Sequence, residues 1–386
     1  LLAVIMIIGL MVSGIAQPVS LKPGDPEKAG CSKAVLERLD NIVQEYIDSQ
    51  WIAGATMIVA KNGTIVYHQA LGFSDISTHA KMKKDNIFRI ASQTKAITSA
   101  GIMILLEQGK ILLDDPVGKY IPAFTTSVVL DKFNEADSSF TTIPAKRPIT
   151  IRDLLTHTSG IGYAQIGSPA YQAITAKAGV IAGLGVPFLS LADQVDKIAR
   201  LPLEFQPGER WSYGLNIDVL GHLIERVSKK PLDKFLRQYI LDPLSMNDTW
   251  FYLPSDHRSR LVALHCEDST GKLYRMTKMT LPDGSENLPD YPNENGRMFA
   301  GGAGLVSTAY DYAIFMQMIL NGGIYNGKRV LSANSVGLMT TNQIGDLSVG
   351  NNKFGLGFAV YTQKSNAQFG VSAGSNDWGG AFSSSY

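Results

Sequence analysis

The stretch Ser92-Gln-Thr-Lys-Ala-Ile-Thr-Ser-Ala-Gly-Ile-Met-Ile-Leu-Leu-Glu-Gln-Gly spans residues 92–109. Its apolar residues recur at helical spacing, and Gly109 follows the last turn, where glycine commonly ends a helix. The stretch therefore predicts a strongly apolar helix that begins near Ser92. Residues three apart on a helix are neighbours on one face, so the Lys95 amine can reach the Ser92 hydroxyl.

Ser-x-x-Lys is a pattern in which the serine acts as a nucleophile. The positive end of the helix dipole stabilises a developing alkoxide and disfavours a protonated lysine, which suits Lys95 to act as a base. The pattern alone is weak, because residues 269–272 also match it in a polar, glycine-containing loop. The alternative for Ser92 is a helix N-cap beside an exposed lysine. The apolar helix that follows favours Ser92 as the candidate nucleophile.

The rest of the chain predicts an α/β protein. Two β-branched runs, 54–60 and 64–68, flank Asn62-Gly63, a pair that suits a tight hairpin turn. Helical spacing recurs at 149–155, 191–199, 219–227 and 232–240. Strand-like character returns at 354–361 and from Trp378. An early hairpin, a helical middle and late strands predict a sheet with a helical lobe inserted between its halves.

Further motifs follow in a consistent order, and together they resemble the β-lactamase-related serine hydrolases. That group includes class C β-lactamases, D-alanyl-D-alanine peptidases and family VIII carboxylesterases. The shared stretches are Ser92–Lys95, Leu113–Pro116, Ile151–Gly160, Pro207-Gly208, Tyr213, Asp218–Gly221, Asp242–Leu244, Gly301–Leu305 and Trp378–Gly380.

The resemblance implies an antiparallel sheet flanked by helices, with an inserted all-helical lobe. We expect a sheet domain formed by residues 30–80 and 260–386, and a mainly helical lobe at 81–259 that carries the Ser-x-x-Lys and tyrosine motifs. The family's sheet continues past the third motif into a further strand and a closing helix. The end of this sequence at residue 386 therefore suggests a C-terminal truncation.

The resemblance also assigns roles to residues. Tyr213 matches the tyrosine that partners Ser-x-x-Lys as general base and later protonates the leaving group. Trp378, Gly379 and Gly380 replace the Lys-Thr-Gly strand of β-lactamases. The N–H groups of Ala381 and Ser92 would then form the oxyanion hole, in which two aimed donors stabilise a tetrahedral intermediate.

Two departures from the family bear on the substrate. The β-lactamase motif Tyr-x-Asn has become Tyr213-Gly-Leu-Asn216, which puts Leu215 where the amide would stand. The lysine that recognises a substrate carboxylate has become Trp378. Apolar groups at both positions favour neutral esters, as in the family VIII carboxylesterases. A β-lactamase or D-alanyl-D-alanine carboxypeptidase is the alternative, and a penicillin-sensor-like module that scarcely turns over is a second.

Residues 1–16 are an apolar run with no charge before Lys22, which is short for a membrane span and typical of a signal-peptide core. We interpret residues 1–20 as a signal-peptide remnant and expect an exported protein, periplasmic or secreted. An uncleaved membrane anchor is the alternative. The missing start methionine suggests that the sequence begins inside the signal.

Composition narrows the partners. Lys and Arg exceed Asp and Glu by 35 − 34 = 1, and no basic run occurs, so we expect no nucleic-acid partner. Two cysteines, Cys31 and Cys266, cannot make a disulfide framework or a zinc ribbon. We expect no cofactor and no metal. The expected partner is a small ester or a β-lactam-like substrate.

Three other patterns compete for a catalytic role. Residues 370–374 match Gly-x-Ser-x-Gly around Ser372, but no histidine follows to complete a triad, so we expect a loop. His222 and Glu225 share a helix face without a third ligand nearby, which favours a surface or packing pair over a metal site. His157 lies in the stretch 151–160, and we expect a structural role for it.

Overall fold

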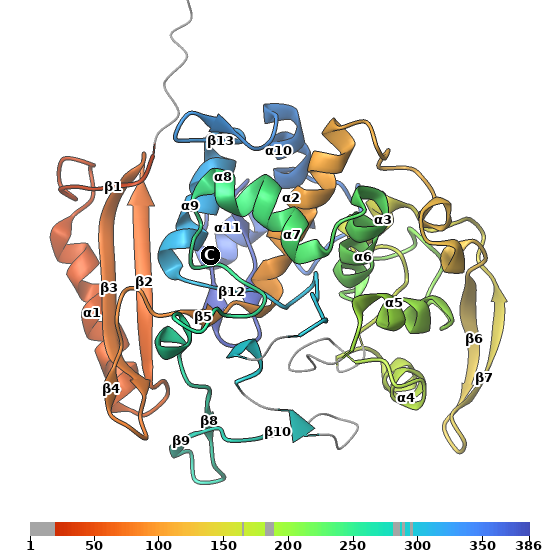
Figure 1. Cartoon of the computed structure of the whole chain (residues 1–386), viewed down its shortest axis with the longest axis horizontal. Coiled ribbons are helices and arrows are strands. Elements are labelled where there is room, and N and C mark those ends of the chain that lie inside the picture. The colour runs from red at the N-terminus through yellow and green to blue at the C-terminus, as the bar shows by residue number, and fades with distance from the viewer. Residues whose placement is uncertain (1–19, 164–165, 182–188, 281–285, 288–289, 294–295) are drawn as a thin grey trace, which may run out of the picture.

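A short sheet and one long helix form one side of the molecule. The computed structural model describes residues 20–163, 166–181, 189–280, 286–287, 290–293 and 296–386. Figure 1 shows the sheet with a helix along it; the elements are β1 (Lys22–Pro23), α1 (Lys33–Asp48), β2 (Gly54–Lys61), β3 (Thr64–Asp75) and β4 (Ala80–Lys81). Strands β2 and β3 are antiparallel, whereas β1 pairs with β3 in parallel.

The predicted hairpin turn is confirmed. Asn62 and Gly63 have φ values of 51° and 77°. A tight hairpin needs positive φ at both central residues, and asparagine and glycine adopt it most readily.

The helix predicted from residue 92 begins with one 3₁₀ turn and continues as an α-helix. The 3₁₀ turn is η1 (Ala91–Gln93), and the α-helix is α2 (Thr94–Glu107). Gly109 follows with a φ of 66°, as the sequence predicted for the stop signal.

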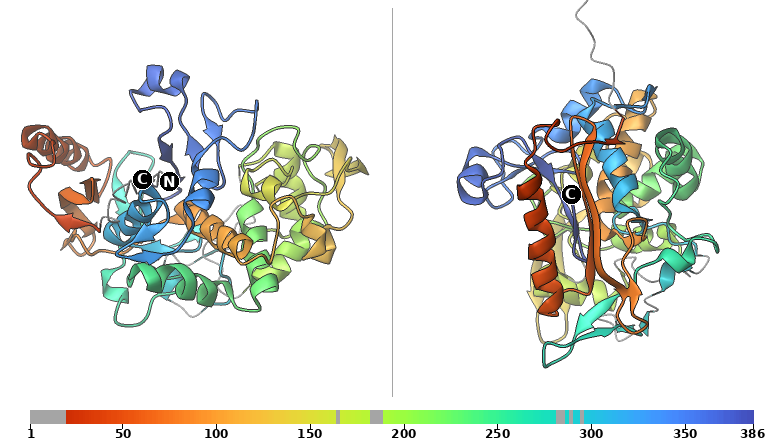
Figure 2. Two further views of the ribbon diagram at one scale, coloured as in Figure 1. Left: turned by 90° about the horizontal axis from the view of Figure 1, so that it is seen from above. Right: turned by 90° about the vertical axis from the view of Figure 1, so that its left-hand side faces the viewer.

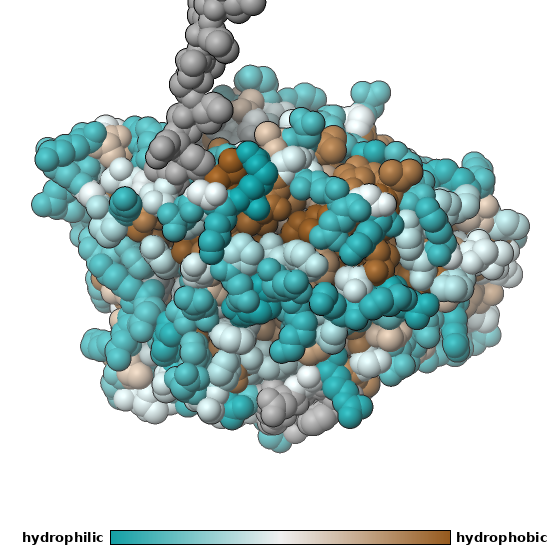
Figure 3. All heavy atoms as spheres, turned by 45° about the horizontal axis from the view of Figure 1, so that its top comes forward, coloured by the Kyte–Doolittle hydropathy of each residue, from teal (hydrophilic) through white to brown (hydrophobic). Residues whose placement is uncertain are grey.

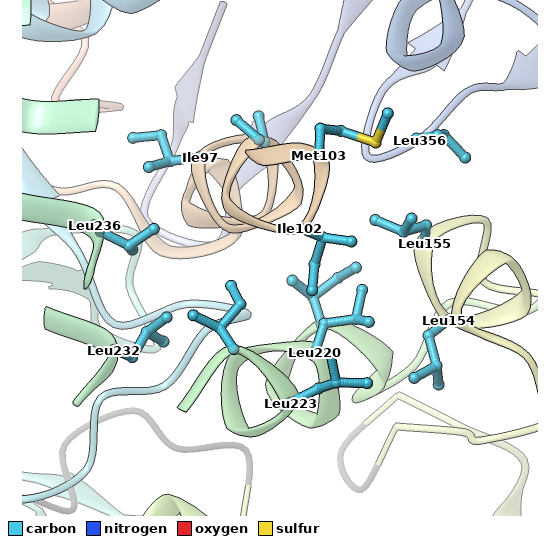
Figure 4. Close-up of a cluster of buried hydrophobic side chains, with 14 of the residues drawn as sticks. Ile97, Ile102, Met103, Leu154, Leu155, Leu220, Leu223, Leu232, Leu236 and Leu356 are labelled. Atoms are coloured by element: carbon cyan, nitrogen blue, oxygen red, sulfur yellow. The ribbon is translucent and has the colours of Figure 1, made fainter. Parts of the chain in front are cut away.

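Helix α2 is buried on nearly all sides because other helices surround it. Twelve of its fourteen residues are buried. Figure 4 shows Ile97, Ile102 and Met103 packed among leucines of the neighbouring helices. The surrounding helices are α3 (Ile151–Leu155), α6 (Asn216–Ser228) and α7 (Leu232–Leu236), with α5 (Leu191–Ala199) packed on α6. An immersed helix of this kind gives its first turn a fixed position.

The late strands form small sheets of their own. The three-stranded sheet runs in the order β15 (Lys353–Phe354), β16 (Ala359–Val360) and β17 (Asn376–Asp377), all antiparallel. A hairpin of β18 (Gly379–Gly380) and β19 (Ser384–Ser385) follows. Only these short strands carry the strand-like character expected at 354–361 and from residue 378. Figure 2 shows this part of the chain from two further directions.

The remaining elements complete the two flanks. They are β5 (Phe88–Arg89), β6 (Val128–Asn134), β7 (Ser139–Pro144), α4 (Pro169–Lys177), the π-helical turn η4 (Arg237–Leu241), α8 (Asp242–Leu244), β8 (His265–Glu267), β9 (Leu273–Arg275), β10 (Met279–Thr280), β11 (Glu286–Asn287), β12 (Val306–Ser307), α9 (Ala309–Leu320), β13 (Ile324–Tyr325), β14 (Lys328–Arg329), α10 (Ala333–Thr340) and α11 (Gln363–Phe369). Short 3₁₀ turns lie at 117–119, 122–124, 258–260 and 291–293.

One hydrophobic core runs through both flanks. It joins Ile65 of β3 to Leu220 of α6 and Phe358 beside β16. The division into a sheet domain and a helical lobe stays a prediction. Figure 3 shows a mostly hydrophilic face on which hydrophobic residues gather in the upper middle.

Two further expectations concern the membrane. No helix in the described part of the chain is long and apolar enough to cross a bilayer. The segment interpreted as a signal-peptide remnant, residues 1–20, lies outside the described residues except for Ser20.

Candidate active site

Two predicted site residues converge on the Ser92 hydroxyl. Ser92 lies in η1, at the start of the buried helix. The Tyr213 hydroxyl donates to Ser92 Oγ over 2.7 Å, and Lys95 Nζ donates to the same oxygen over 3.2 Å. Sequence spacing predicted the lysine contact, but Tyr213 is 121 residues away and only the family resemblance indicated it. The three side chains form a connected hydrogen-bonded group.

The backbone before Ser92 is strained. Ala91 has a φ of 42°, in the left-handed region that residues with a Cβ atom rarely adopt. Such strain persists only where the surrounding structure fixes it, and it concentrates at active sites. Ala91 is fully buried. The turn that presents Ser92 is therefore held in place by its packing.

Lys95 is a buried cation, only 3% exposed. Its Nζ also donates to the Gly302 carbonyl over 2.7 Å and lies 4.7 Å from the centre of the Tyr213 ring. These contacts hold the amine between a backbone carbonyl, the Ser92 oxygen and an aromatic face.

A buried carboxyl group lies near this lysine. Asp218, in the first turn of α6, accepts the Gly302 N–H at Oδ1 over 3.1 Å. Burial raises the pKa of Asp218 to about 6, while the Lys95 charge and the Gly302 N–H act in the opposite direction. A Cβ atom on Gly302 would lie 2.5 Å from Asp218 Oδ2, which explains the glycine at this position. The sequence analysis quoted Asp218 within a family motif without giving it a role.

Aromatic rings surround the Tyr213 hydroxyl. Tyr163 stacks on Tyr213 with ring centres 5.5 Å apart and planes 12° apart. The Trp378 ring lies 5.4 Å from the Tyr213 ring, and its Nε1–H donates to the Tyr213 oxygen over 3.4 Å. Trp211 packs against both Tyr213 and Trp378. An indole N–H aimed at the phenol oxygen stabilises negative charge on it.

The strand expected to border the site lies beside Ser92. Gly379 and Gly380 pair with Ser385 and Ser384 in the β18–β19 hairpin. A Cβ atom on Gly380 would collide with the Ile90 carbonyl, two residues before Ser92. Only glycine permits this approach. Ala381 is exposed in the turn that follows β18.

Leu215 is not brought to the site. It is 1% exposed, belongs to the hydrophobic core and precedes α6 as its N-cap. Its N–H donates to the Gly162 carbonyl. The expectation that Leu215 borders the substrate is therefore corrected: a leucine at this helix start gains more by packing inward.

The competing motifs lie elsewhere, as the sequence predicted. Ser372 is exposed in the turn after α11, and Ser269 lies in the β8–β9 turn. His222 Nδ1 lies 3.3 Å from Glu225 Oε2, and Glu225 also accepts the Leu232 N–H. Among the described residues no cluster of three or more His, Cys, Asp or Glu side chains could hold a metal ion.

Comparisons with known proteins bear on the same arrangement. A sequence model described as beta-lactamase matches residues 39–386. Esterase EstB of Burkholderia gladioli is 31% identical over 281 residues, which cover 71% of this chain and 67% of EstB. A putative D-alanyl-D-alanine carboxypeptidase of Escherichia coli is 28% identical over 371 residues, which cover 92% of this chain and 79% of that protein.

A solved structure agrees with these relatives. It is titled EstCE1, a hydrolase with promiscuous acyltransferase activity, and it superposes with a TM-score of 0.75 at 26% identity. The match covers 91% of this chain and 89% of that one.

Proposed function

This chain belongs to the beta-lactamase family and is a serine hydrolase, and from that premise we propose that it hydrolyses small neutral carboxylic esters through an acyl-Ser92 intermediate. The observation that carries the proposal is the convergence of the Tyr213 hydroxyl and the Lys95 amine on Ser92 Oγ. A serine hydroxyl is a weak nucleophile, and an adjacent base activates it.

Acylation begins with a proton transfer. Ser92 Oγ attacks the ester carbonyl carbon while its proton passes to the Tyr213–Lys95 pair, and the carbonyl electron pair moves onto oxygen. The Ser92–Tyr213 hydrogen bond must reverse for this step, so that Ser92 donates. The N–H groups of Ser92 and Ala381 then bind the oxyanion. The bond to the alcohol oxygen breaks, and the alcohol leaves with the proton held by the pair.

Deacylation repeats the chemistry with water. The pair takes a proton from a water molecule, whose oxygen attacks the acyl carbonyl carbon. The bond to Ser92 Oγ breaks, the serine oxygen regains the proton, and the carboxylic acid departs. Because the same two side chains accept and return each proton, the step needs no metal.

The preference for neutral esters rests on Trp378. Its indole lies beside Tyr213, at the position where the resemblance places a carboxylate-binding lysine in β-lactamases. An apolar ring offers no charge partner to an anionic substrate, and leaving a substrate carboxylate unpaired is costly. The similarity to esterase EstB supports the same preference.

The test is a substrate panel on purified protein. We expect hydrolysis of p-nitrophenyl acetate and butyrate, with much slower hydrolysis of the β-lactam nitrocefin. EDTA should leave the ester rate unchanged. Ester hydrolysis that is lost with EDTA and restored by zinc would refute the mechanism, as would ester hydrolysis that survives Ser92→Ala.

An amide hydrolase is the second candidate, and the similarity to the putative D-alanyl-D-alanine carboxypeptidase favours it. Faster turnover of nitrocefin or of a D-alanyl-D-alanine peptide than of esters would support this candidate. Stable acylation of Ser92 by a penicillin without turnover of any substrate would instead support a sensor module.

We also propose that the protein is exported. The support is the uninterrupted apolar run of residues 1–16. Fractionation of a producing cell tests the proposal: we expect the processed protein outside the cytoplasm, and an unprocessed cytoplasmic protein would contradict it.

A further inference from the structure

His157 binds the backbone on both sides of Tyr213. Its carbonyl oxygen accepts the Ser212 N–H over 2.9 Å, and its ring nitrogen Nδ1 accepts the Gly214 N–H over 3.3 Å. The imidazole also packs on the Tyr213 ring, with centres 4.9 Å apart. One residue therefore holds the two peptide groups that flank the tyrosine.

A chain of hydrogen bonds fixes which nitrogen of His157 carries the proton. Ser159 Oγ accepts the Ile161 N–H over 3.0 Å, so its own hydroxyl proton is free to donate to Asn216 Oδ1, 2.5 Å away. That contact turns the Asn216 amide nitrogen toward His157 Nδ1 at 3.0 Å. Two N–H donors thus point at Nδ1, which must accept, and the ring proton resides on Nε2.

The surroundings keep this imidazole neutral. His157 is 1% exposed, and burial followed by the Lys95 charge holds its pKa well below its usual range. The groups that face it are Lys95, Tyr213, Trp211 and Asn216, and none supplies an anion. A protonated His157 would lose the acceptor at Nδ1 and repel Lys95.

We propose that His157, as a neutral imidazole protonated at Nε2, is a positioning residue that holds the Tyr213 phenol at hydrogen-bonding distance from Ser92. The inference rests on the proposed role of Tyr213 in proton transfer. Proton transfer depends steeply on geometry, and a displacement of about 1 Å can cost about 10²-fold in rate. Asn216, one position later than in the β-lactamase motif, supports this clamp.

Two variants separate the acceptor from the backbone strain. His157 has a φ of 57°, which both asparagine and glycine tolerate. His157→Asn places an acceptor oxygen near the position of Nδ1, whereas H157G removes it. We expect H157N to keep kcat within about tenfold of the parent, and H157G to lose about 10²-fold or more with little change in KM.

A matched control comes from His79, an exposed histidine with a φ of 56°. H79N and H79G should leave the kinetics unchanged. In a Tyr213→Phe background, H157G should cost little more, because His157 acts through the tyrosine. A full additional loss in that background would overturn the inference, as would equal activities of H157N and H157G.

The outcomes distinguish the two levels of the argument. If Tyr213→Phe keeps parental activity, the proposed function fails. If Tyr213→Phe is inactive but H157G is fully active, only this inference fails. Nitrogen-15 NMR of the parent protein provides a measurement that needs no variant to fold: we expect a proton on Nε2 of one non-titrating histidine among the six in the sequence. A proton on Nδ1 of His157 would overturn the assignment.

Discussion

Neutralising the buried carboxyl beside the lysine should stabilise the protein. Asp218→Asn keeps the shape of the side chain and an oxygen for the Gly302 N–H, but removes the charge. The pKa of Asp218 is about 6 in the folded protein, against 3.8 for an ordinary aspartate. Each pKa unit corresponds to about 1.4 kcal/mol, so the buried charge costs ~3 kcal/mol of folding free energy.

The sign follows from proton binding. Between pH 3.8 and about 6 the folded protein holds a proton on Asp218 that the unfolded chain has released. Stability therefore falls as pH rises through this window, and the full cost is present above it. The variant lacks this term at every pH.

The assay is urea unfolding of the parent and D218N at pH 4, 6 and 8. We expect equal free energies of unfolding near pH 4 and an advantage of ~3 kcal/mol for the variant at pH 8. Asp311, whose pKa burial also raises to about 6, is present in both proteins, so its contribution cancels. A variant that is no more stable than the parent at pH 8 would refute the reasoning.

Three further predictions concern the reacting groups. Ser92→Ala should abolish ester hydrolysis while Ser372→Ala spares it; a fluorophosphonate adduct mapped to Ser372 by mass spectrometry would contradict the assignment. Lys95→Ala and Tyr213→Phe should each lower kcat/KM by ~10²–10⁴-fold, and the double variant should lose little more, because the two act as one proton-transfer unit; losses that multiply would argue against the unit. Trp378→Lys should slow p-nitrophenyl ester hydrolysis and speed acylation by anionic penicillins, measured as inactivation rates; an unchanged preference would show that Trp378 does not select the substrate.

Local patterns predicted the parts of the fold that depend on neighbouring residues. Asn62-Gly63 gave the hairpin turn because its backbone geometry demands those residue types. The boundaries of α5, Leu191–Ala199, matched the sequence expectation because its apolar spacing is regular. The late strands were harder to place, because stretches as short as β15 and β16 show too few residues to reveal a partner.

The site divides in the same way. The Ser92–Lys95 contact follows from helix geometry, whereas Tyr213 needed a family pattern to connect it with Ser92. The Gly302 carbonyl that holds Lys95 is a backbone atom, and no residue type announces it. Leu215 was assigned by analogy with a motif whose spacing differs here, and the inward turn at the start of α6 removed it from the site.

The ring cluster beside Ser92 also gives the protein an intrinsic optical probe. Of its four tryptophans, Trp211 and Trp378 lie with ring centres 6.5 Å apart next to Tyr213. Trp51 is 63% exposed, and Trp250 stacks on the Arg237 guanidinium. An acyl group on Ser92 changes the surroundings of the first two and leaves the others as they were. Emission from the unlabelled protein can therefore follow the lifetime of the acyl-enzyme in real time, even with substrates that have no chromophore.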